Sequence, residues 1–214
     1  IPAEIKELHD YGVTRIYSPH DGQQLGLQGM IDDMLKRCRE DSSRPPCPDL
    51  SELGKHDPKL LTRGITGIEN GDYAAPDLEG LIDQAAAVKT VPILGITGTG
   101  GAGKSSSTDE LIRRFRQDSA DSLRIAVLAI DPTRKKTGGA LLGDRIRMNA
   151  IDHDNVFMRS LATRSAAVEV PGRLTEILAA IRLSGFDLII VETPGIGQGD
   201  AGIVPFVDTS LYIM

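Results

Sequence analysis

The sequence predicts an α/β fold, a doubly wound parallel sheet with helices on both faces, for residues 91–214. Short apolar runs alternate there with helical segments, as expected for parallel strands joined by crossover helices. The apolar residues are mostly Ile, Leu, Val and Ala, with 4% aromatic residues and no Trp, which suits strands buried on both faces. A glycine-rich turn joins the first predicted strand to the first predicted helix.

Hydrophobic periodicity predicts the individual elements of this α/β part. The expected strands are Pro92–Thr97, Arg124–Ile130, Val156–Ser160, Asp187–Glu192 and Thr209–Met214. The expected helices are Lys104–Gln117, Ala140–Asp152 and Pro171–Ser184. The last helix starts with Pro and is followed by Gly185, residues typical of these two helix positions.

The first 40 residues predict a small helix–strand–helix unit. We expect a helix at Ala3–Tyr11, a strand at Val13–Tyr17 and a second helix at Leu25–Arg39. Because such a unit cannot bury its apolar faces alone, we interpret it as the end of a larger domain.

Residues 41–90 predict a partly helical linker. A Pro-rich run opens the segment, a composition typical of linkers. One helix, capped by Asp77 and ending near Lys89, is expected inside it. The chain starts with Ile1 and ends in what looks like an unfinished strand, so we interpret it as an excerpt of a longer protein.

Composition argues against several classes of protein. The net charge is −6, which gives no electrostatic reason to expect nucleic acid as a partner. We find no apolar run long enough for a membrane span and no signal peptide. Cys38 and Cys47 are close enough in sequence for a disulfide, but reduced thiols in a cytoplasmic protein fit better.

The glycine-rich turn matches the phosphate-binding P-loop, G-x-x-x-x-G-K-[ST], at every fixed position. Glycines let backbone N–H groups wrap phosphates closely, and the helix N-terminus adds partial positive charge. Lys104 is expected on the β- and γ-phosphates, and the Ser105 hydroxyl on Mg²⁺. The predicted nucleotide contacts are Gly98, Gly100, Gly101, Ala102, Gly103, Lys104, Ser105 and Ser106.

Oxygen donors for Mg²⁺ follow two of the predicted strands. Asp131 and the Ile130 carbonyl stand at the end of one, and Glu192 ends another at the Walker B position. The carboxyl ends of parallel strands form the edge at which α/β proteins bind ligands. Thr193 is a further candidate. Helix capping or loop salt bridges are the alternative roles for Asp131 and Glu192.

Two glycine-rich segments are candidates for mobile switches near the phosphates. Asp144 lies in the first and is a candidate metal and catalytic residue, with Arg147 as a candidate phosphate contact or a surface charge. Glu192-Thr193-Pro194-Gly195 stands where many GTPases have D-x-x-G. Gln198 follows it and is a candidate for orienting the attacking water.

Three segments resemble the metallochaperone GTPases that attend cobalamin enzymes such as methylmalonyl-CoA mutase. The segments are Ala129-Ile130-Asp131-Pro132-Thr133, Gly138-Gly139-Ala140-Leu141-Leu142-Gly143-Asp144-Arg145-Ile146-Arg147-Met148 and Val191-Glu192-Thr193-Pro194-Gly195-Ile196-Gly197-Gln198. The resemblance implies a P-loop NTPase of the SIMIBI class. It also implies that Lys104 and Arg147 contact nucleotide, and that Ser105, Asp131, Asp144 and Glu192 form the metal site.

The N-terminal segment resembles the end of a flavodoxin-like cobalamin-binding domain of acyl-CoA mutases. The matching residues are Ile1-Pro2-Ala3-Glu4, Leu8, Gly12-Val13 and Ile16-Tyr17-Ser18-Pro19. A cobalamin-domain end, a linker and a GTPase in this order resemble the fused isobutyryl-CoA mutases. The resemblance implies adenosylcobalamin and acyl-CoA as ligands of the longer protein, interconversion of isobutyryl-CoA and n-butyryl-CoA, and a homodimer.

Two other functions remain open at this level. A P-loop kinase would use Asp131 as base and Arg134, Lys135 and Lys136 as a phosphate clamp, whereas a scaffold would bind nucleotide without hydrolysis. The E-x-x-G element favours a GTPase switch. The choice between guanine and adenine is open, because the N-K-x-D motif that reads guanine is expected after the last strand.

Overall fold

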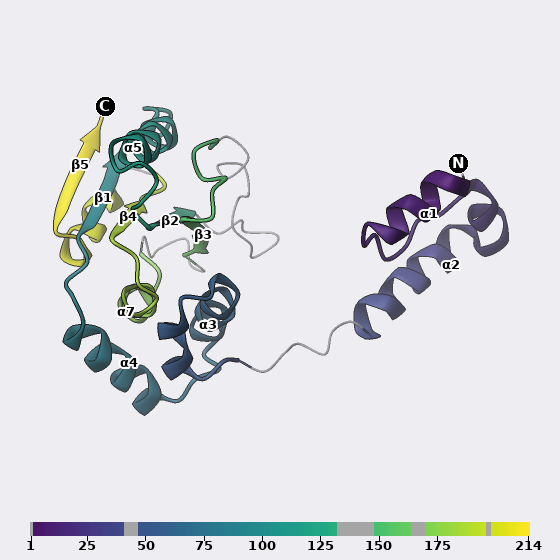
Figure 1. Cartoon of the computed structure of the whole chain (residues 1–214), viewed down its shortest axis with the longest axis horizontal. Helices are drawn as coiled ribbons and strands as arrows, with labels where there is room; N and C mark the ends of the chain where they lie inside the picture. The colour runs from purple at the N-terminus through teal and green to yellow at the C-terminus, as the bar shows by residue number, and fades with distance from the viewer. Residues whose placement is uncertain (1, 41–46, 132–147, 164–169, 196–197) are drawn as a thin grey trace. The chain divides into compact units, whose positions relative to one another are not determined.

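The computed structural model describes residues 2–40, 47–131, 148–163, 170–195 and 198–214, which belong to two compact units, 1–46 and 47–214 (Figure 1). The first unit contains α1 (Pro2–Asp10) and α2 (Pro19–Glu40). The helices of the second are η1 (Leu50–Lys55), α3 (Pro58–Asn70), α4 (Ala75–Ala87), α5 (Lys104–Asp118), α7 (Leu174–Leu183) and η2 (Gln198–Phe206). Its strands are β1 (Ile93–Gly98), β2 (Ile125–Asp131), β3 (Val156–Ala162), β4 (Leu188–Glu192) and β5 (Thr209–Ile213).

The five strands form one parallel sheet in the order β3-β2-β4-β1-β5. The predicted parallel α/β sheet is therefore confirmed, and each expected strand of residues 91–214 is present within two residues of its predicted ends. Between β1 and β2 the chain crosses over β4, so that β4 lies beside β1. This exchange of strand order places the carboxyl end of β4 next to the turn that follows β1.

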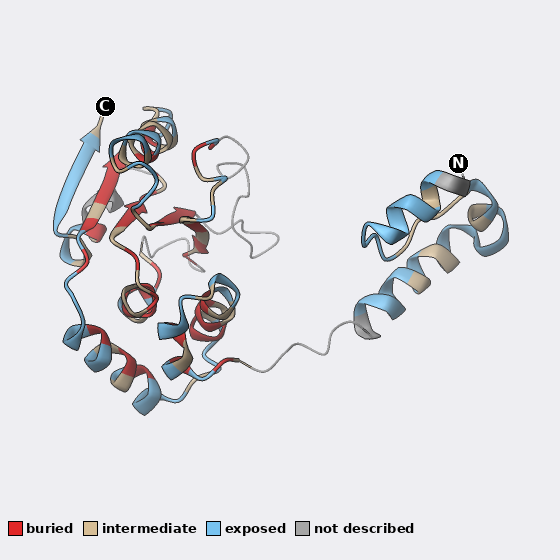
Figure 2. Ribbon diagram, viewed as in Figure 1, coloured by how far each residue is buried: buried red, intermediate tan, exposed pale blue. Residues whose placement is uncertain are grey.

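Each face of the sheet has its own apolar core, as the two-residue period of a strand requires. Along β2, Ala126, Leu128 and Ile130 belong to one core, whereas Val127 and Ala129 belong to the other. The second core includes Ile112 of α5. Figure 2 shows the central strands buried and the edge strand β5 exposed.

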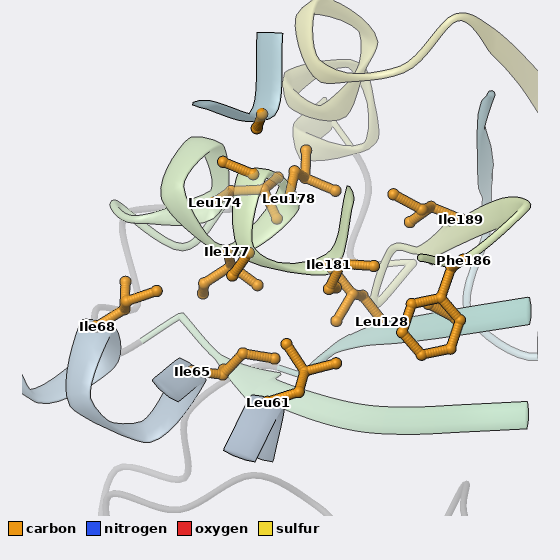
Figure 3. Close-up of a cluster of buried hydrophobic side chains, with 14 of the residues drawn as sticks. Leu61, Ile65, Ile68, Leu128, Leu174, Ile177, Leu178, Ile181, Phe186 and Ile189 are labelled. Atoms are coloured by element: carbon orange, nitrogen blue, oxygen red, sulfur yellow. The ribbon is translucent and has the colours of Figure 1, made fainter. Parts of the chain in front are cut away.

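The first core joins α3, α4 and α7 to the sheet. Leu61, Ile65 and Ile68 of α3 are each at most 1% exposed, and they face α7 and the sheet residue Leu128 (Figure 3). The structure thus differs from the expected linker, because residues 47–90 pack as part of the α/β unit.

Later Pro and Gly residues of the expected linker stand at helix ends, whereas residues 41–46 of its Pro-rich run lie outside the described part of the chain. The Asp57 side chain accepts a 2.7 Å hydrogen bond from Lys59 N, Pro58 opens α3, and Gly71 ends it in the left-handed conformation. These are ordinary start and stop signals. Asp77 lies within the first turn of α4 rather than capping it, because the helix already begins at Ala75 with Ala74 in the cap position.

Within the first unit, α1 and α2 are helical, but the expected strand Val13–Tyr17 has no strand partner among the described residues and is not a strand. Side chains hold this segment to α2 instead. Arg15 lies 2.9 Å from Asp21, and the Tyr17 hydroxyl donates a 2.8 Å bond to Asp33. A strand forms only where another strand completes its hydrogen bonds.

The second helix was expected to begin at Leu25, but α2 begins at Pro19, and Ser18 and Asp21 bond to each other at its start. The Ser18 hydroxyl and backbone N–H both donate to Asp21, and Pro19 is the first helical residue. These two bonds, followed by the bond from Arg15, hold the pKa of the Asp21 carboxyl well below its ordinary value. Gly26 kinks the helix with a φ of 62°.

The expected helix Ala140–Asp152 lies mostly outside the described residues, and its described end, 148–152, is not helical. Cys38 and Cys47 are not joined by a disulfide. Among the residues described, no helix is both long enough and apolar enough to cross a membrane.

The packing of α3 predicts a large effect of Leu61→Ala. Removing a side chain that is 1% exposed should lower the free energy of unfolding of the α/β unit by about 2–5 kcal/mol. Denaturant unfolding followed by circular dichroism measures this loss. Val88→Ala, at a position 42% exposed, is the control and should change little. An unchanged denaturant unfolding transition in Leu61→Ala would contradict the packing of α3 against the sheet and favour an independent linker.

Candidate functional site

The glycine-rich turn connects β1 directly to α5. Gly98 has a φ of 137°, and a Cβ there would lie 2.0 Å from the Ile213 carbonyl oxygen, so the close passage of β5 requires glycine. Gly103, with a φ of 89°, is the residue before α5 begins. The loop between them therefore leads into a helix N-terminus, where backbone N–H groups and the helix dipole favour an anion.

Lys104 is buried, with 7% of its surface exposed, and its ammonium binds backbone oxygens of the loop. Its Nζ donates to Gly98 O at 3.0 Å and to Thr99 O at 2.9 Å. These carbonyls keep the Lys104 ammonium at the loop rather than in solvent. The same positive group is available to phosphate oxygens at the loop.

Glu192 is the carboxylate that α5 contacts. It is 5% exposed, and its two oxygens accept hydrogen bonds from two hydroxyls of the helix. The Ser105 hydroxyl donates to Oε1 at 2.6 Å and the Thr108 hydroxyl lies 2.9 Å from Oε2. The register explains this meeting, because Glu192 is the strand partner of Ile96, two residues before the turn.

Asp131 and Ile130 end β2 at the same edge of the sheet. Glu192 pairs with Ala129 of β2, so Asp131 lies two residues beyond that pair. Asp131 is 4% exposed and Ile130 is 2% exposed. The sheet thus brings Asp131 to the edge at which Ser105 meets Glu192.

Thr193 continues β4 beside β1. Its hydroxyl oxygen lies 3.2 Å from that of Thr97, and its backbone N–H donates to Ile96 O. Ser106 is exposed and lines a groove between α5 and β5 with Leu211 and Ile213.

The donor chemistry at this edge fits Mg²⁺. The converging groups are one hydroxyl and carboxylates, all oxygen donors, and Mg²⁺ takes one or two carboxylates while phosphate and water complete its octahedron. Among the described residues there is no group of three or more His, Cys, Asp or Glu side chains arranged to hold a metal ion. A metal that shares its ligands with a bound nucleotide matches this sparse donor set.

Several predicted site residues lie outside the described part of the chain. These are Asp144 and Arg147, the side chain of Gln198, and the alternative phosphate clamp Arg134, Lys135 and Lys136. Their roles stay predictions.

Sequence reasoning missed two features of the site. Thr108 lies four residues after Lys104, hence on the same helix face, and this spacing was a signal that could have identified it. The second feature is the contact of Gly195 with the P-loop. A Cβ at Gly195 would lie 2.0 Å from Lys104 Nζ and 2.7 Å from Gly98 O. These residues are far apart in sequence, so only the fold brings them together.

Comparison with known proteins gives consistent matches. Residues 61–214 match the family described as "Methylmalonyl Co-A mutase-associated GTPase MeaB". The chain is 59% identical over its whole length to a fused isobutyryl-CoA mutase of Cupriavidus metallidurans, and 51% identical to one of Geobacillus kaustophilus. It spans 20% of the length of each of these two proteins.

A solved structure shares the fold. The crystal structure of a LAO/AO transport system kinase matches 77% of this chain and 48% of its own, with a TM-score of 0.54 and 22% identity. At this identity the likeness concerns the fold alone.

The approach of Gly195 to the loop predicts that Gly195→Ala destabilises the unit. The backbone there has a φ of 73°, which costs a non-glycine residue about 1–2 kcal/mol, and the new methyl group would meet Lys104 and Gly98. Chemical denaturation should show a loss of at least about 1 kcal/mol. Gly172→Ala, where a Cβ meets nothing within 4 Å, is the matched control. Equal stability of both variants would contradict the described contact.

Proposed function

Because the chain belongs to the family of methylmalonyl-CoA mutase-associated GTPases, we propose that its residues 91–214 bind and hydrolyse Mg²⁺–GTP, and that the nucleotide state controls adenosylcobalamin loading and release in a mutase of the same protein. The observation that supports it is the meeting of Lys104, Ser105 and Glu192 at one end of β1. The family supports guanine as the base.

The residues of the turn would hold the triphosphate. Backbone N–H groups from Gly98 to Ser105 and the N-terminus of α5 provide partial positive charge, and Lys104 adds a full one. Lys104 would exchange its carbonyl partners for β- and γ-phosphate oxygens. The exchange is favourable because an ammonium binds an anion more strongly than a neutral carbonyl.

In hydrolysis, a water oxygen bonds to the γ-phosphorus, the bond to the β–γ bridging oxygen breaks, and GDP and phosphate leave with one proton released. Bound Mg²⁺ would neutralise the charge that develops on the phosphate oxygens. Ser105, Asp131, Glu192, Thr193, the Ile130 carbonyl and Asp144 are the residues that would hold it, directly or through water. Lys104 would stabilise the charge of the leaving GDP, and Gln198 would orient the water.

The first unit supports a link to cobalamin through its resemblance to the end of a cobalamin-binding domain. The full-length relatives are named as fused isobutyryl-CoA mutases. We therefore propose that the longer protein interconverts isobutyryl-CoA and n-butyryl-CoA with adenosylcobalamin, acts as a homodimer and works in the cytoplasm. A nucleotide-dependent contact between tethered domains can be weak and still be effective, because tethering raises the effective concentration.

Control by nucleotide needs an element with two states that depend on the γ-phosphate. The segment after Glu192 is suited to this, because Gly195 contacts both Lys104 and the turn. A γ-phosphate at the turn would displace or reorder that contact. A kinase and a non-hydrolysing scaffold are the alternatives, and assays with and without a phosphate acceptor separate them.

Substitutions in the turn should separate binding from hydrolysis. Lys104→Ala should abolish tight GTP binding and leave the fold intact, since the left-handed glycines do not depend on that side chain. Glu192→Ala and Asp131→Ala should lower hydrolysis more than they lower binding. Calorimetric titration measures GTP binding, and the rate of phosphate release measures hydrolysis. Unchanged GTP affinity of Lys104→Ala would refute the phosphate-binding assignment.

The regulatory part is tested on the intact protein. The rate of adenosylcobalamin transfer should differ between a non-hydrolysable GTP analogue, GDP and no nucleotide. Lys104→Ala should remove that difference because it does not bind the nucleotide. Equal rates in all three states of the unsubstituted protein would leave hydrolysis without this regulatory role.

A further inference from the structure

Thr108 contacts the candidate metal-site carboxylate from the buried side of α5. It is 0% exposed, and its hydroxyl oxygen lies 2.9 Å from Glu192 Oε2 and 3.0 Å from the Lys104 carbonyl. A hydroxyl has one proton. The charged carboxylate is the stronger of these two acceptors, so the proton favours Glu192.

The two helix hydroxyls contact different oxygens of the Glu192 carboxylate. Ser105 binds Oε1 and Thr108 binds Oε2, so together they fix both the position and the plane of the Glu192 carboxylate. Ser105 is only half-buried and is the hydroxyl expected at the cation. Thr108 is fully buried one turn further along α5, where its hydroxyl contacts Glu192 and the Lys104 carbonyl.

We propose that Thr108 is a positioning residue of the Mg²⁺ site, which holds Glu192 Oε2 so that the other oxygen and Ser105 face the cation together. The proposal rests on the proposed binding of Mg²⁺–GTP. Without the Thr108 hydroxyl, the carboxylate loses the hydrogen bond to Oε2 that helps to fix its plane, and the cost of orienting it would then weaken binding of the cation. The nucleotide alone gains nothing from this hydroxyl, because the turn and Lys104 contact the phosphates.

A purely structural role for Thr108 is the competing explanation, since its hydroxyl also reaches the carbonyl one turn back. Ser184 offers a matched control. It is 2% exposed, and its hydroxyl donates to the Ala180 carbonyl at 2.9 Å in the same i to i−4 arrangement, in α7 and the turn after it. Ser184→Ala therefore removes such a bond without changing a residue of the site.

The experiment measures the affinity of the intact protein for a non-hydrolysable GTP analogue by calorimetry, once with excess Mg²⁺ and once with EDTA. The dissociation constant in EDTA divided by the dissociation constant with Mg²⁺ reports the coupling between cation and nucleotide. Thr108→Val, of nearly equal volume, should reduce this ratio about tenfold, as expected for a lost hydrogen bond to a charged group. Its affinity in EDTA should match that of the unsubstituted protein. Thr108→Ser and Ser184→Ala should both keep the original ratio.

Two results would overturn the proposal. One is an unchanged ratio in Thr108→Val, whether its affinity stays the same or falls equally with Mg²⁺ and with EDTA. The other is a Thr108→Ser variant as weak as Thr108→Val. If Thr108→Val fails to fold, Thr108→Ala replaces it with the same expectations. If the unsubstituted protein binds the analogue equally well with and without Mg²⁺, the proposed function itself fails, an outcome distinguishable from failure at Thr108 alone.

Discussion

Glu192 meets the first turn of α5 because β4 is hydrogen-bonded to β1, and the rest of the site depends on this pairing. The register sets Ile96 opposite Glu192, so β4 ends where the glycine-rich turn begins. A shift of one residue would point the carboxylate toward the opposite face of the sheet. The helix then adds Ser105 and Thr108, whose hydroxyls donate hydrogen bonds to the Glu192 carboxylate. Burying this carboxylate without such donors would be costly.

The neighbouring core keeps that register fixed. The strands β1, β2 and β4 are buried between α5 on one face and α3, α4 and α7 on the other. Since α3 and α7 hold the strand residues on one side, a change in their packing would reach the sheet edge. The helices of residues 47–90 therefore serve the site indirectly, although they supply none of its described side chains.

Gly195 links the residues of the site to the proposed nucleotide-dependent switch. Its backbone lies against Lys104 and Gly98 only because it has no side chain. Lys104 meanwhile binds carbonyls of the turn, which are weaker partners for an ammonium than phosphate. A nucleotide bound as proposed would bias the position of Gly195 through its own contacts with Lys104, which is the differential interaction that a switch requires.

The sequence by itself determined the parallel α/β fold, the order of the strands along the chain and the glycine-rich turn between β1 and α5. These are local or periodic signals: apolar strands, amphipathic helices, and eight consecutive residues from Gly98 to Ser105. It failed where local signals are ambiguous. Asp57, Pro58 and Gly71 read equally well as linker residues and as helix ends, and a lone extended segment at 13–17 had no strand to pair with. Only the tertiary structure decided that α3 belongs to the core, that Thr108 binds Glu192, and that Gly195 lies on Lys104, because each of these contacts joins residues that are distant in sequence or depends on strand register.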